Sequence, residues 1–351
     1  HTPVSAGHDR FSYDLVKQVW KEPLPWELLQ MLGGKDELNM TYLALNMSDY
    51  INGVAKRHGE VAQEMFPGHV IDSITNGVHS VTWTCDSFKA LYDRYISGWR
   101  NDPFGLRHAI SISKQELWDA HVEAKAQLIE EVNRRTQLSF NNDVLTLGFA
   151  RRATLYKRAD LIFFNPHQLA EIAKTVGPIQ IIFGGKAHPR DGGGKDMIRR
   201  VIQFAQQLKN EVLIVYLENY DIALAKLLTS GVDLWLNTPH RPMEASGTSG
   251  MKATHNGIPN FSVLDGWWIE GHIEGVTGWS IRPTTESQAQ SETGDQEEAQ
   301  ELYQKLRTVI VPMFYHDRDK WIDVMRQSIA INASFFNTHR MVQQYAANAY
   351  V

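Results

Sequence analysis

VLTLGFA, at residues 144–150, is the first of four short apolar runs that share one composition. The others are IQIIFGG (179–185), EVLIVYL (211–217) and VDLWLN (232–237). Such runs, with little polar alternation, are typical of strands that are buried on both faces of a sheet. The segments between them, such as KDMIRRVIQFAQQLK, have the three- and four-residue apolar spacing of helices. Strand and helix alternate three times, so we predict an α/β fold with a doubly wound parallel sheet.

A long helix is predicted just before the first of these strands. It begins at Ser113 in SKQELWDAHVEAKAQLIEEVNRR, where Ser113 and Glu116 have the spacing of a capping box. Its apolar residues recur on one face, as a helix packed on a core requires. These residues are Leu117, Ala120, Ala124, Leu128 and Val132. Two short helices are predicted earlier in the chain, within residues 37–65.

The turn pair Asn76-Gly77 interrupts a β-branched stretch, and we place a domain boundary there. The predicted domains are therefore residues 1–76 and 77–351. Residues 284–300 are polar and acidic, which predicts a mobile loop leading into a helix. Three further helices are predicted at about 297–314, 317–333 and 339–349.

The composition excludes several classes of protein. The 351 residues carry 35 basic and 40 acidic side chains, so no positive excess attracts nucleic acid or an anionic membrane over a distance. The single cysteine, Cys85, excludes an internal disulfide framework and a multi-cysteine zinc site, and it fits a reducing, cytoplasmic compartment. No metal-binding spacing and no apolar run of membrane-spanning length are found. Any anionic ligand must therefore be bound by local contacts.

The segment after the first strand places four cations within eight residues, from Arg151 to Arg158. In open α/β sheets, ligands bind beyond the carboxyl ends of the strands. Arginine and lysine at such a position suit a phosphate, because a guanidinium binds two oxygens and an ammonium acts as a point charge. A solvated basic turn is the alternative interpretation of this cluster alone.

The segment after the fourth strand, TPHRPMEASGTSGMK (238–252), is rich in small residues. Small residues allow a close approach of the backbone, and a helix that begins near Gly250 would direct free N–H groups at an anion. An ordinary helix N-cap explains the serines and threonine equally well. Lys252 and Glu244 indicate functions beyond anion binding. A lysine behind such a loop can form a Schiff base, and a carboxylate at its entrance can bind sugar hydroxyls.

Together these residues resemble the α-glucan phosphorylases, which comprise the glycogen, starch and maltodextrin phosphorylases, and most closely the shorter prokaryotic type. The resemblance rests on EASGTSGMK (244–252) and SVLDGWW (262–268), and it extends to RRATLYKR (151–158), ENYDIALAKLL (218–228) and TNGVHSVTW (75–83). It implies a GT-B type glycosyltransferase fold, with two facing Rossmann-like domains. This chain would hold the C-terminal, pyridoxal-phosphate-binding domain and the end of the N-terminal, glucan-side domain.

The resemblance also implies the residues that hold a cofactor. Pyridoxal 5′-phosphate would be attached covalently to Lys252. Its 5′-phosphate would be held by Arg151, Thr248 and Ser249, and Tyr220 would lie against its ring. Arg152 and Lys157 would hold inorganic phosphate, or the phosphate of glucose 1-phosphate, beside it.

The glucosyl unit has a second set of implied contacts. The groups that would hydrogen-bond its hydroxyls are Glu244, Ser246, Gly247, Asn76 and His1. His1 would also assist the reaction around the sugar ring, and Tyr156 lies between the cationic positions Arg152 and Lys157. Two phosphates in contact repel strongly at low dielectric, so the three cations Arg151, Arg152 and Lys157 suit the arrangement.

The implied reaction is phosphorolysis of a terminal α-1,4-linked glucosyl unit by inorganic phosphate, giving glucose 1-phosphate with retention of configuration. The cofactor's phosphate would pass a proton through the substrate phosphate to the glycosidic oxygen. Implied partners are the glucan, a further N-terminal region that carries a Gly-rich loop, and a second copy in a homo-oligomer. Two alternatives stay open: a nucleotide-sugar glucosyltransferase of the same architecture without pyridoxal, and an inactive glucan-binding fragment.

Overall fold

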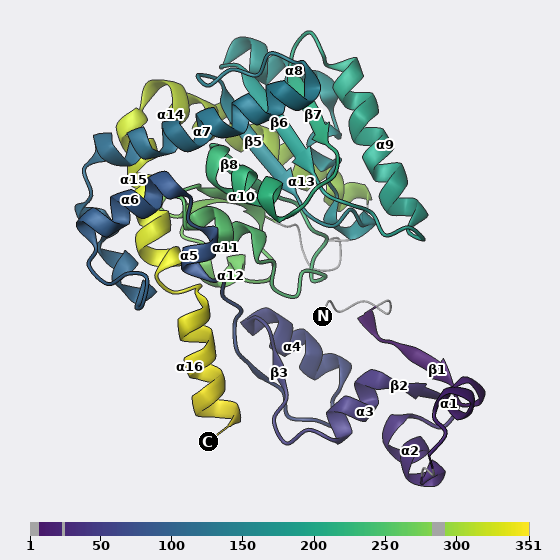
Figure 1. Cartoon of the computed structure of the whole chain (residues 1–351). Coiled ribbons are helices and arrows are strands. Elements are labelled where there is room, and N and C mark those ends of the chain that lie inside the picture. The colour runs from purple at the N-terminus through teal and green to yellow at the C-terminus, as the bar shows by residue number, and fades with distance from the viewer. Residues whose placement is uncertain (1–6, 23–24, 283–291, 351) are drawn as a thin grey trace.

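The computed structural model describes residues 7–22, 25–282 and 292–350 (Figure 1). Within these residues, a central sheet of six strands has the order β7-β6-β5-β8-β9-β10, with every neighbouring pair parallel. This is the order of a doubly wound nucleotide-binding sheet, so the predicted parallel sheet is confirmed. The strands are β5 (Leu145–Ala150), β6 (Ile179–Gly184), β7 (Leu213–Leu217), β8 (Leu234–Asn237), β9 (Asn260–Val263) and β10 (Gly278–Ile281).

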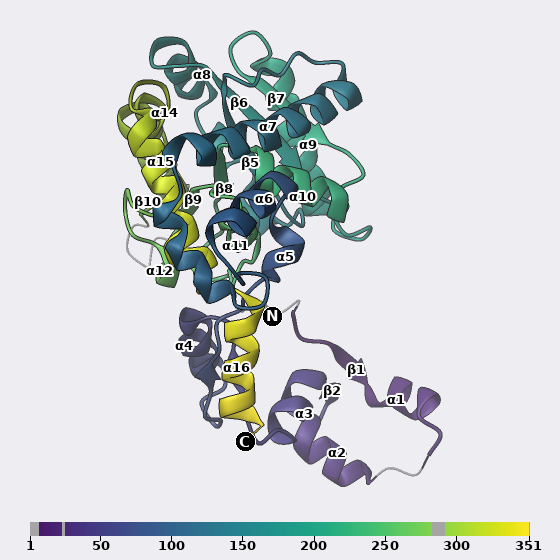
Figure 2. The same ribbon diagram turned by 60° about the vertical axis from the view of Figure 1, so that its left-hand side comes forward.

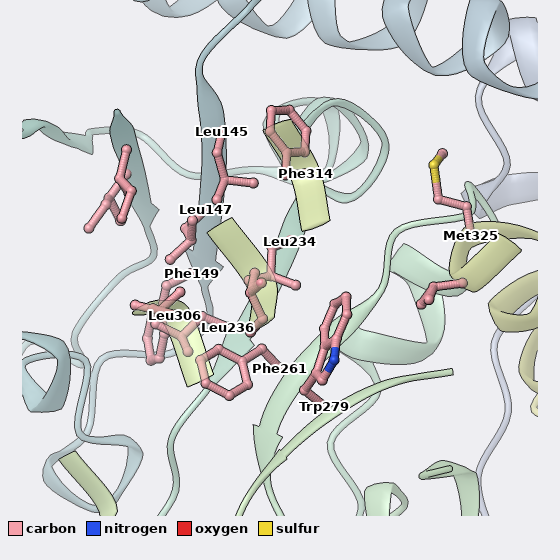
Figure 3. Close-up of a cluster of buried hydrophobic side chains, with 14 of the residues drawn as sticks. Leu145, Leu147, Phe149, Leu234, Leu236, Phe261, Trp279, Leu306, Phe314 and Met325 are labelled. Carbon is pink, nitrogen blue, oxygen red and sulfur yellow. The ribbon is translucent and has the colours of Figure 1, made fainter. Parts of the chain in front are cut away.

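Helices cover both faces of the sheet because its strands bury both faces. Leu145, Leu147 and Phe149 of β5 point into one apolar core (Figure 3), whereas Ala150 packs in the other. The first core is covered mainly by α8 (Pro166–Thr175), α9 (Gly192–Gln207), α13 (Glu292–Lys305), α14 (Val311–His316) and α15 (Arg318–Gln327). The second is covered by α10 (Ile222–Gly231), the carboxyl half of α7 (Lys114–Thr136) and α11 (Ser249–Thr254).

The predicted long helix is confirmed as α7, and all five residues of its predicted stripe are buried. Its predicted capping box is wrong. Ser113 occupies the N-cap position, but its hydroxyl makes no capping hydrogen bond. Glu116 accepts hydrogen bonds from Arg94 and Tyr95 of the neighbouring helix α6 (Asp86–Tyr95) instead, because that helix offers a cation and a hydroxyl.

The C-terminal helices lie close to the predicted positions, but α13 begins at Glu292, five residues before the predicted start at 297. The segment Leu306–Ile310 (η5) is a π-helix that continues α13 into α14, and Ser328–Ala333 (η6) continues α15 in the same way. Residues 284–291 of the predicted mobile loop lie outside the described residues, whereas residues 292–300 of that prediction belong to α13. Within the described ranges, no helix is both long enough and apolar enough to cross a membrane.

Other short helices connect the main elements. They are α5 (Ser80–Trp83), η2 (Pro103–Ser111), η3 (Leu155–Lys157), η4 (Leu161–Phe163) and α12 (Trp268–Gly271).

Residues 7–75 form a smaller part beside the sheet domain (Figures 1 and 2). Its predicted helices within residues 37–65 are confirmed as α3 and α4. Helix α16 (Thr338–Ala349) lies along this part, and Arg340 donates hydrogen bonds to the carbonyl oxygens of Thr75 and Asn76. The elements of this part are β1 (Arg10–Ser12), α1 (Tyr13–Val19), α2 (Trp26–Gly33), β2 (Glu37–Asn39), α3 (Met40–Asn46), β3 (Asn52–Gly53), α4 (Lys56–Met65) and β4 (Asp72–Ser73).

Candidate functional site

Strands β5 and β8 lie side by side at the point where the strand order of the sheet reverses. The first loop (residues 151–158) follows β5, and the second loop (residues 238–248) follows β8. Parallel strands present their carboxyl ends at one edge, and a reversal of strand order opens a crevice there. The two segments singled out by the sequence therefore meet at the place where this architecture binds ligands.

Glu244 is the centre of a buried charge cluster at this edge. Its Oε2 accepts hydrogen bonds from Nη2 of Arg151 at 2.7 Å and from Nζ of Lys157 at 2.6 Å. Arg151 also donates to Oδ1 of Asn237, the last residue of β8. Burial alone would raise the pKa of Glu244, but Arg151 and Lys157 outweigh it, so that this pKa lies below its ordinary value.

Lys157 is held between the two loops. Its ammonium lies 4.4 Å from the ring centroid of Tyr156, whose carbonyl oxygen accepts a hydrogen bond from the backbone N–H of His240. Burial and the nearby Arg151 lower the pKa of Lys157 to about 7, against the opposing effect of Glu244. Burial, reinforced by Glu244, raises the pKa of Tyr156 to about 12. Lys157 is therefore a cation whose charge depends on its immediate neighbours near neutral pH.

The other two cations of the first loop lie outside this cluster. The side chain of Arg152 is exposed, and among the described residues no hydrogen bond or ion pair joins it to Glu244 or Lys157. Arg158 is buried and donates to the carbonyl oxygens of Thr238 and Pro239, and it pairs with Asp295 and Glu298 of α13. Arg158 thus joins the two loops to a helix and is a structural residue.

Lys252 lies in α11, directly behind the second loop. Its Nζ lies 4.0 Å from the ring centroid of Trp83, and no carboxylate of the described residues pairs with it. Burial lowers its pKa. At the start of the same helix, Ser249 accepts a hydrogen bond from the indole of Trp235, whereas the side chain of the N-cap residue Thr248 makes no capping bond. A lysine with a lowered pKa and no acidic partner is suited to nucleophilic attachment of a carbonyl group.

The Glu244 loop, residues 244–247, contains a polar group without a partner. The hydroxyl of Ser246 is buried and has no hydrogen-bond partner among the described atoms, and the same is true of Nε of Arg151. Gly247 has a φ of 77°, and a Cβ there would lie 3.1 Å from the carboxyl carbon of Glu244. A buried donor without a partner is rare in folded proteins, and these two donors are available to a ligand.

The remaining predicted site residues are Tyr220, Asn76 and His1. Tyr220 is half-buried near Arg151, and burial raises its pKa to about 12. Asn76 lies at the junction with residues 7–75, where its backbone bonds Val54 and Arg340. His1 lies outside the described residues.

Sequence reasoning missed three residues of this site, namely Asn237, Trp83 and Asp265. Asn237 ends the run VDLWLN and could have been found as the first polar side chain at a strand end. Trp83 approaches Lys252 across 169 positions of sequence, which no local signal reports. Asp265 follows β9, a strand that was not predicted. In the described part of the chain, no cluster of His, Cys, Asp or Glu could hold a metal ion.

Comparisons with known proteins agree with the resemblance. A family model described as "Carbohydrate phosphorylase" matches residues 7–310. The maltodextrin phosphorylase of Thermococcus litoralis is 40% identical over all of this chain and 46% of its own length. Glycogen phosphorylases of Aquifex aeolicus and Mycobacterium tuberculosis are 37% and 34% identical over the whole chain, which covers 56% and 46% of them. The chain thus spans about half the length of these curated relatives. It belongs to the carbohydrate phosphorylase family.

Proposed function

We propose that this chain carries the cofactor and phosphate site of an α-1,4-glucan phosphorylase, which releases glucose 1-phosphate from a glucan with retention of configuration. The observation that carries the proposal is Lys252, half-buried against Trp83 without an acidic partner and placed behind the second loop. The names of the relatives, maltodextrin phosphorylase and glycogen phosphorylase, support the substrate class. We infer that the rest of the relatives' length provides the other wall of the site.

The fold and setting of the whole protein are part of this proposal. We infer a GT-B arrangement, in which residues 77–351 form the pyridoxal-phosphate-binding domain and residues 1–76 belong to the glucan-side domain. The six-stranded parallel sheet supports the first domain. A cytoplasmic location is supported by the single, unpaired Cys85, and a homo-oligomer rests on the resemblance alone.

The residues present fit pyridoxal phosphate. Lys252 has an amine free to attach the aldehyde, and Arg151 has a buried Nε without a partner that can donate to the 5′-phosphate. Thr248 has a side chain that no helix-capping bond occupies, and Tyr220 supplies a half-buried ring near Arg151. When bound, the cofactor would supply a phosphate that can give and take a proton.

The chain's own side chains would position the substrates. Lys157, with Arg152 from the exposed side of the first loop, would hold inorganic phosphate. Lys157 has a pKa of about 7, and a phosphate dianion beside it would favour its charged form. Glu244, the unpartnered hydroxyl of Ser246 and the backbone of Gly247 would hold glucosyl hydroxyls. The buried location strengthens each of these electrostatic contacts relative to water.

The test uses the intact protein, supplied with pyridoxal phosphate and treated with borohydride, which makes the attachment permanent. Peptide mass spectrometry is expected to find the adduct on Lys252, and Lys252→Ala is expected to abolish it. Lys226→Ala, which changes an exposed lysine of α10, is the matched control and should keep the adduct. An adduct that remains at another lysine would reject the assignment.

Activity is measured as glucose 1-phosphate released from maltodextrin in the presence of inorganic phosphate. Release that depends on both added cofactor and Lys252 supports the proposal. Glucosyl transfer from a nucleotide sugar without cofactor would identify the glycosyltransferase alternative. Glucan binding without either reaction would identify a non-catalytic binding protein.

A further inference from the structure

Asp265 is a buried carboxylate at the same edge of the sheet as Glu244. It follows β9 in the third loop, residues 264–267, and is only 1% exposed. Its Oδ2 accepts a hydrogen bond from the backbone N–H of Glu244 at 2.9 Å, and its Oδ1 accepts one from the N–H of Gly266 at 2.9 Å. No ion pair between described residues includes Asp265, although Arg241 is close enough for its charge to favour the charged form of the carboxyl group. The hydrogen bonds of the Asp265 carboxylate are made to main chain.

The third loop also holds the opposite end of the Glu244 loop. The backbone N–H of Trp267 donates to the carbonyl oxygen of Ser246 at 2.9 Å. Gly266, with a φ of 54°, lies so close that a Cβ there would be 2.3 Å from the same oxygen. The Glu244 loop is thus fixed at Glu244 by Asp265 and at Ser246 by Trp267.

Burying a carboxylate at this position has a desolvation cost. Burial raises the pKa of Asp265 to about 7, although the two N–H donors favour its charged form. An asparagine would avoid the desolvation penalty, but its amide group offers only one acceptor oxygen for two N–H groups. Only a carboxylate of this length accepts from both donors, so its contacts offset the burial of a charge.

We propose that Asp265 is the positioning residue of the Glu244 loop, holding the main chain so that the carboxylate of Glu244 meets Arg151 and Lys157. The proposal rests on the proposed function only in taking this loop to face the glucosyl unit. The hydrogen bonds on which the positioning role depends are made only between described residues of this chain. Both contacts of Glu244 lie within 2.7 Å, and displacement of its backbone would lengthen them.

The test compares Asp265→Asn with Asp265→Ala in the intact protein. Both variants remove the charge, but asparagine keeps one acceptor and alanine keeps none. With cofactor supplied, Asp265→Asn should raise the KM for glucan about tenfold, and Asp265→Ala should raise it more, since each hydrogen bond to a charged group contributes at that level. The KM for phosphate should change less. Asp191→Asn is the matched control, because it removes the charge of a carboxylate that also accepts a hydrogen bond from a backbone N–H, that of Gly194 in α9.

A second readout does not depend on activity. The titration of Lys157 is followed by NMR in protein labelled with [¹³C]lysine and assigned with Lys157→Arg. Loss of the Glu244 contact should lower the pKa of Lys157 below about 7, further in Asp265→Ala than in Asp265→Asn. Asp191→Asn should leave this titration unchanged.

Equal effects of the two variants on both readouts would show that only the charge of Asp265 matters, and would overturn the positioning role. An unchanged Lys157 titration in both variants would overturn it as well. If the wild-type protein shows no phosphorolysis, the proposed function fails, and the Lys157 titration still decides the role of Asp265.

Discussion

The amino and carboxyl ends of the parallel strands form two opposite edges of the sheet, and each edge buries a carboxylate between basic side chains, but the two clusters are completed differently. At the amino edge, Asp233 accepts from Nζ of Lys125 at 2.6 Å and from Nε2 of His121 at 2.8 Å. At the carboxyl edge, Glu244 accepts from Arg151 and Lys157. The amino-edge cluster is then tied to the backbone: Thr146 donates its N–H to Asp233 at 2.7 Å, and Lys125 donates to the carbonyl oxygen of Val144 at 2.8 Å.

The two clusters differ in how many of their polar groups are bonded within the protein. Asp233 and Lys125 direct their contacts to Thr146 and Val144 at the start of β5 and to each other, so they fix α7 on the sheet. The carboxyl edge leaves Nε of Arg151 and the hydroxyl of Ser246 without partners. At the amino edge, Nδ1 of His121 is the comparable unpartnered atom. A buried charge cluster therefore indicates a ligand site only when several of its donors stay unused.

The largest expected effect is the loss of stability in Asp233→Asn. Removing this charge leaves Lys125 buried without a counterion and weakens the contact to the strands, so the free energy of unfolding should fall by about 3–5 kcal/mol. Glu244→Gln should cost less, about 1–2 kcal/mol, because Lys157 has a pKa of about 7 and releases its proton readily, and because Arg151 keeps the side-chain oxygen of Asn237 as an acceptor. Urea unfolding of both variants measures the two losses. A loss for Glu244→Gln as large as that for Asp233→Asn would contradict the comparison.

The cations of the first loop should separate into three kinds. Arg151→Ala should weaken retention of pyridoxal phosphate. Lys157→Ala and Arg152→Ala should raise the KM for phosphate instead, by about tenfold or more for the buried Lys157 and less for the exposed Arg152. Cofactor content and the phosphate dependence of phosphorolysis measure these effects in the intact protein.

Arg158→Ala is the matched control for this series, because Arg158 binds the protein itself. It should lower the urea midpoint without a selective effect on the KM for phosphate. Loss of cofactor with normal phosphate dependence in Arg152→Ala and Lys157→Ala would reject the proposed division of roles.

The contrast between Lys157 and Arg158 shows a feature of the site that the local sequence pattern does not predict. The two cations are adjacent in the sequence, and both fit a phosphate loop equally well. In the structure, Arg158 has a φ of 45°, and its side chain turns to α13 while Lys157 faces Glu244. A left-handed backbone at a single arginine is not encoded in any local pattern, because few residues other than glycine and asparagine favour it.

The strands were predictable to the extent that they are apolar and β-branched. The predicted runs at 144–150 and 179–185 contain β5 and β6, whose six residues each are buried. Strands β9 and β10, NFSV and GWSI, were missed because each has four residues and includes polar or small side chains. These polar side chains are buried by pairing within the sheet, which only the assembled fold reveals. Missing β9 also hid Asp265.

A fall in pH should increase the stability contributed by Asp265 at the carboxyl edge and decrease the stability contributed by Asp233 at the amino edge. Burial raises the pKa of Asp265 from 3.8 to about 7, so the folded protein keeps a proton that the unfolded chain releases. Its contribution to stability is therefore fully present below about pH 4 and is lost as the pH rises to 7. Relative to Asp265→Asn, the wild type should lose about 2 kcal/mol between pH 5 and pH 7.5. Urea unfolding at these two pH values measures the change.

Asp233 serves as a control, because its pKa is shifted in the opposite direction to that of Asp265. Burial acts to raise its pKa, but Lys125 and His121 outweigh it, so the pKa is lowered and the stabilisation is lost only as the pH falls below the ordinary range of an aspartate. The difference between wild type and Asp233→Asn should stay level from pH 5 to pH 7.5. A wild-type advantage over Asp265→Asn that is equally level would show that Asp265 is already ionised at pH 5 in the folded protein.

The smallest expected effect compares one hydroxyl at each edge. Ser246 has a buried hydroxyl without a partner, so Ser246→Ala should leave the free energy of unfolding unchanged or raise it by up to about 1 kcal/mol. Thr146 donates its hydroxyl to the carbonyl oxygen of Val144 at 2.9 Å and accepts from Gln180 at 2.7 Å. Thr146→Val keeps the shape but loses both bonds, and should cost about 1–2 kcal/mol.

The effects of Ser246→Ala and Thr146→Val on the KM for glucan should have the opposite order to their effects on stability. Ser246→Ala removes a donor that the proposed function assigns to a glucosyl hydroxyl, so the KM for glucan should rise by roughly three- to tenfold while the urea midpoint holds or increases. Thr146→Val should lower the midpoint with the KM unchanged, because Thr146 lies at the amino edge, away from the site. If Ser246→Ala lowered stability as much as Thr146→Val, its hydroxyl would have a partner within the folded chain. It would then belong with the amino-edge groups, whose bonds hold the sheet together.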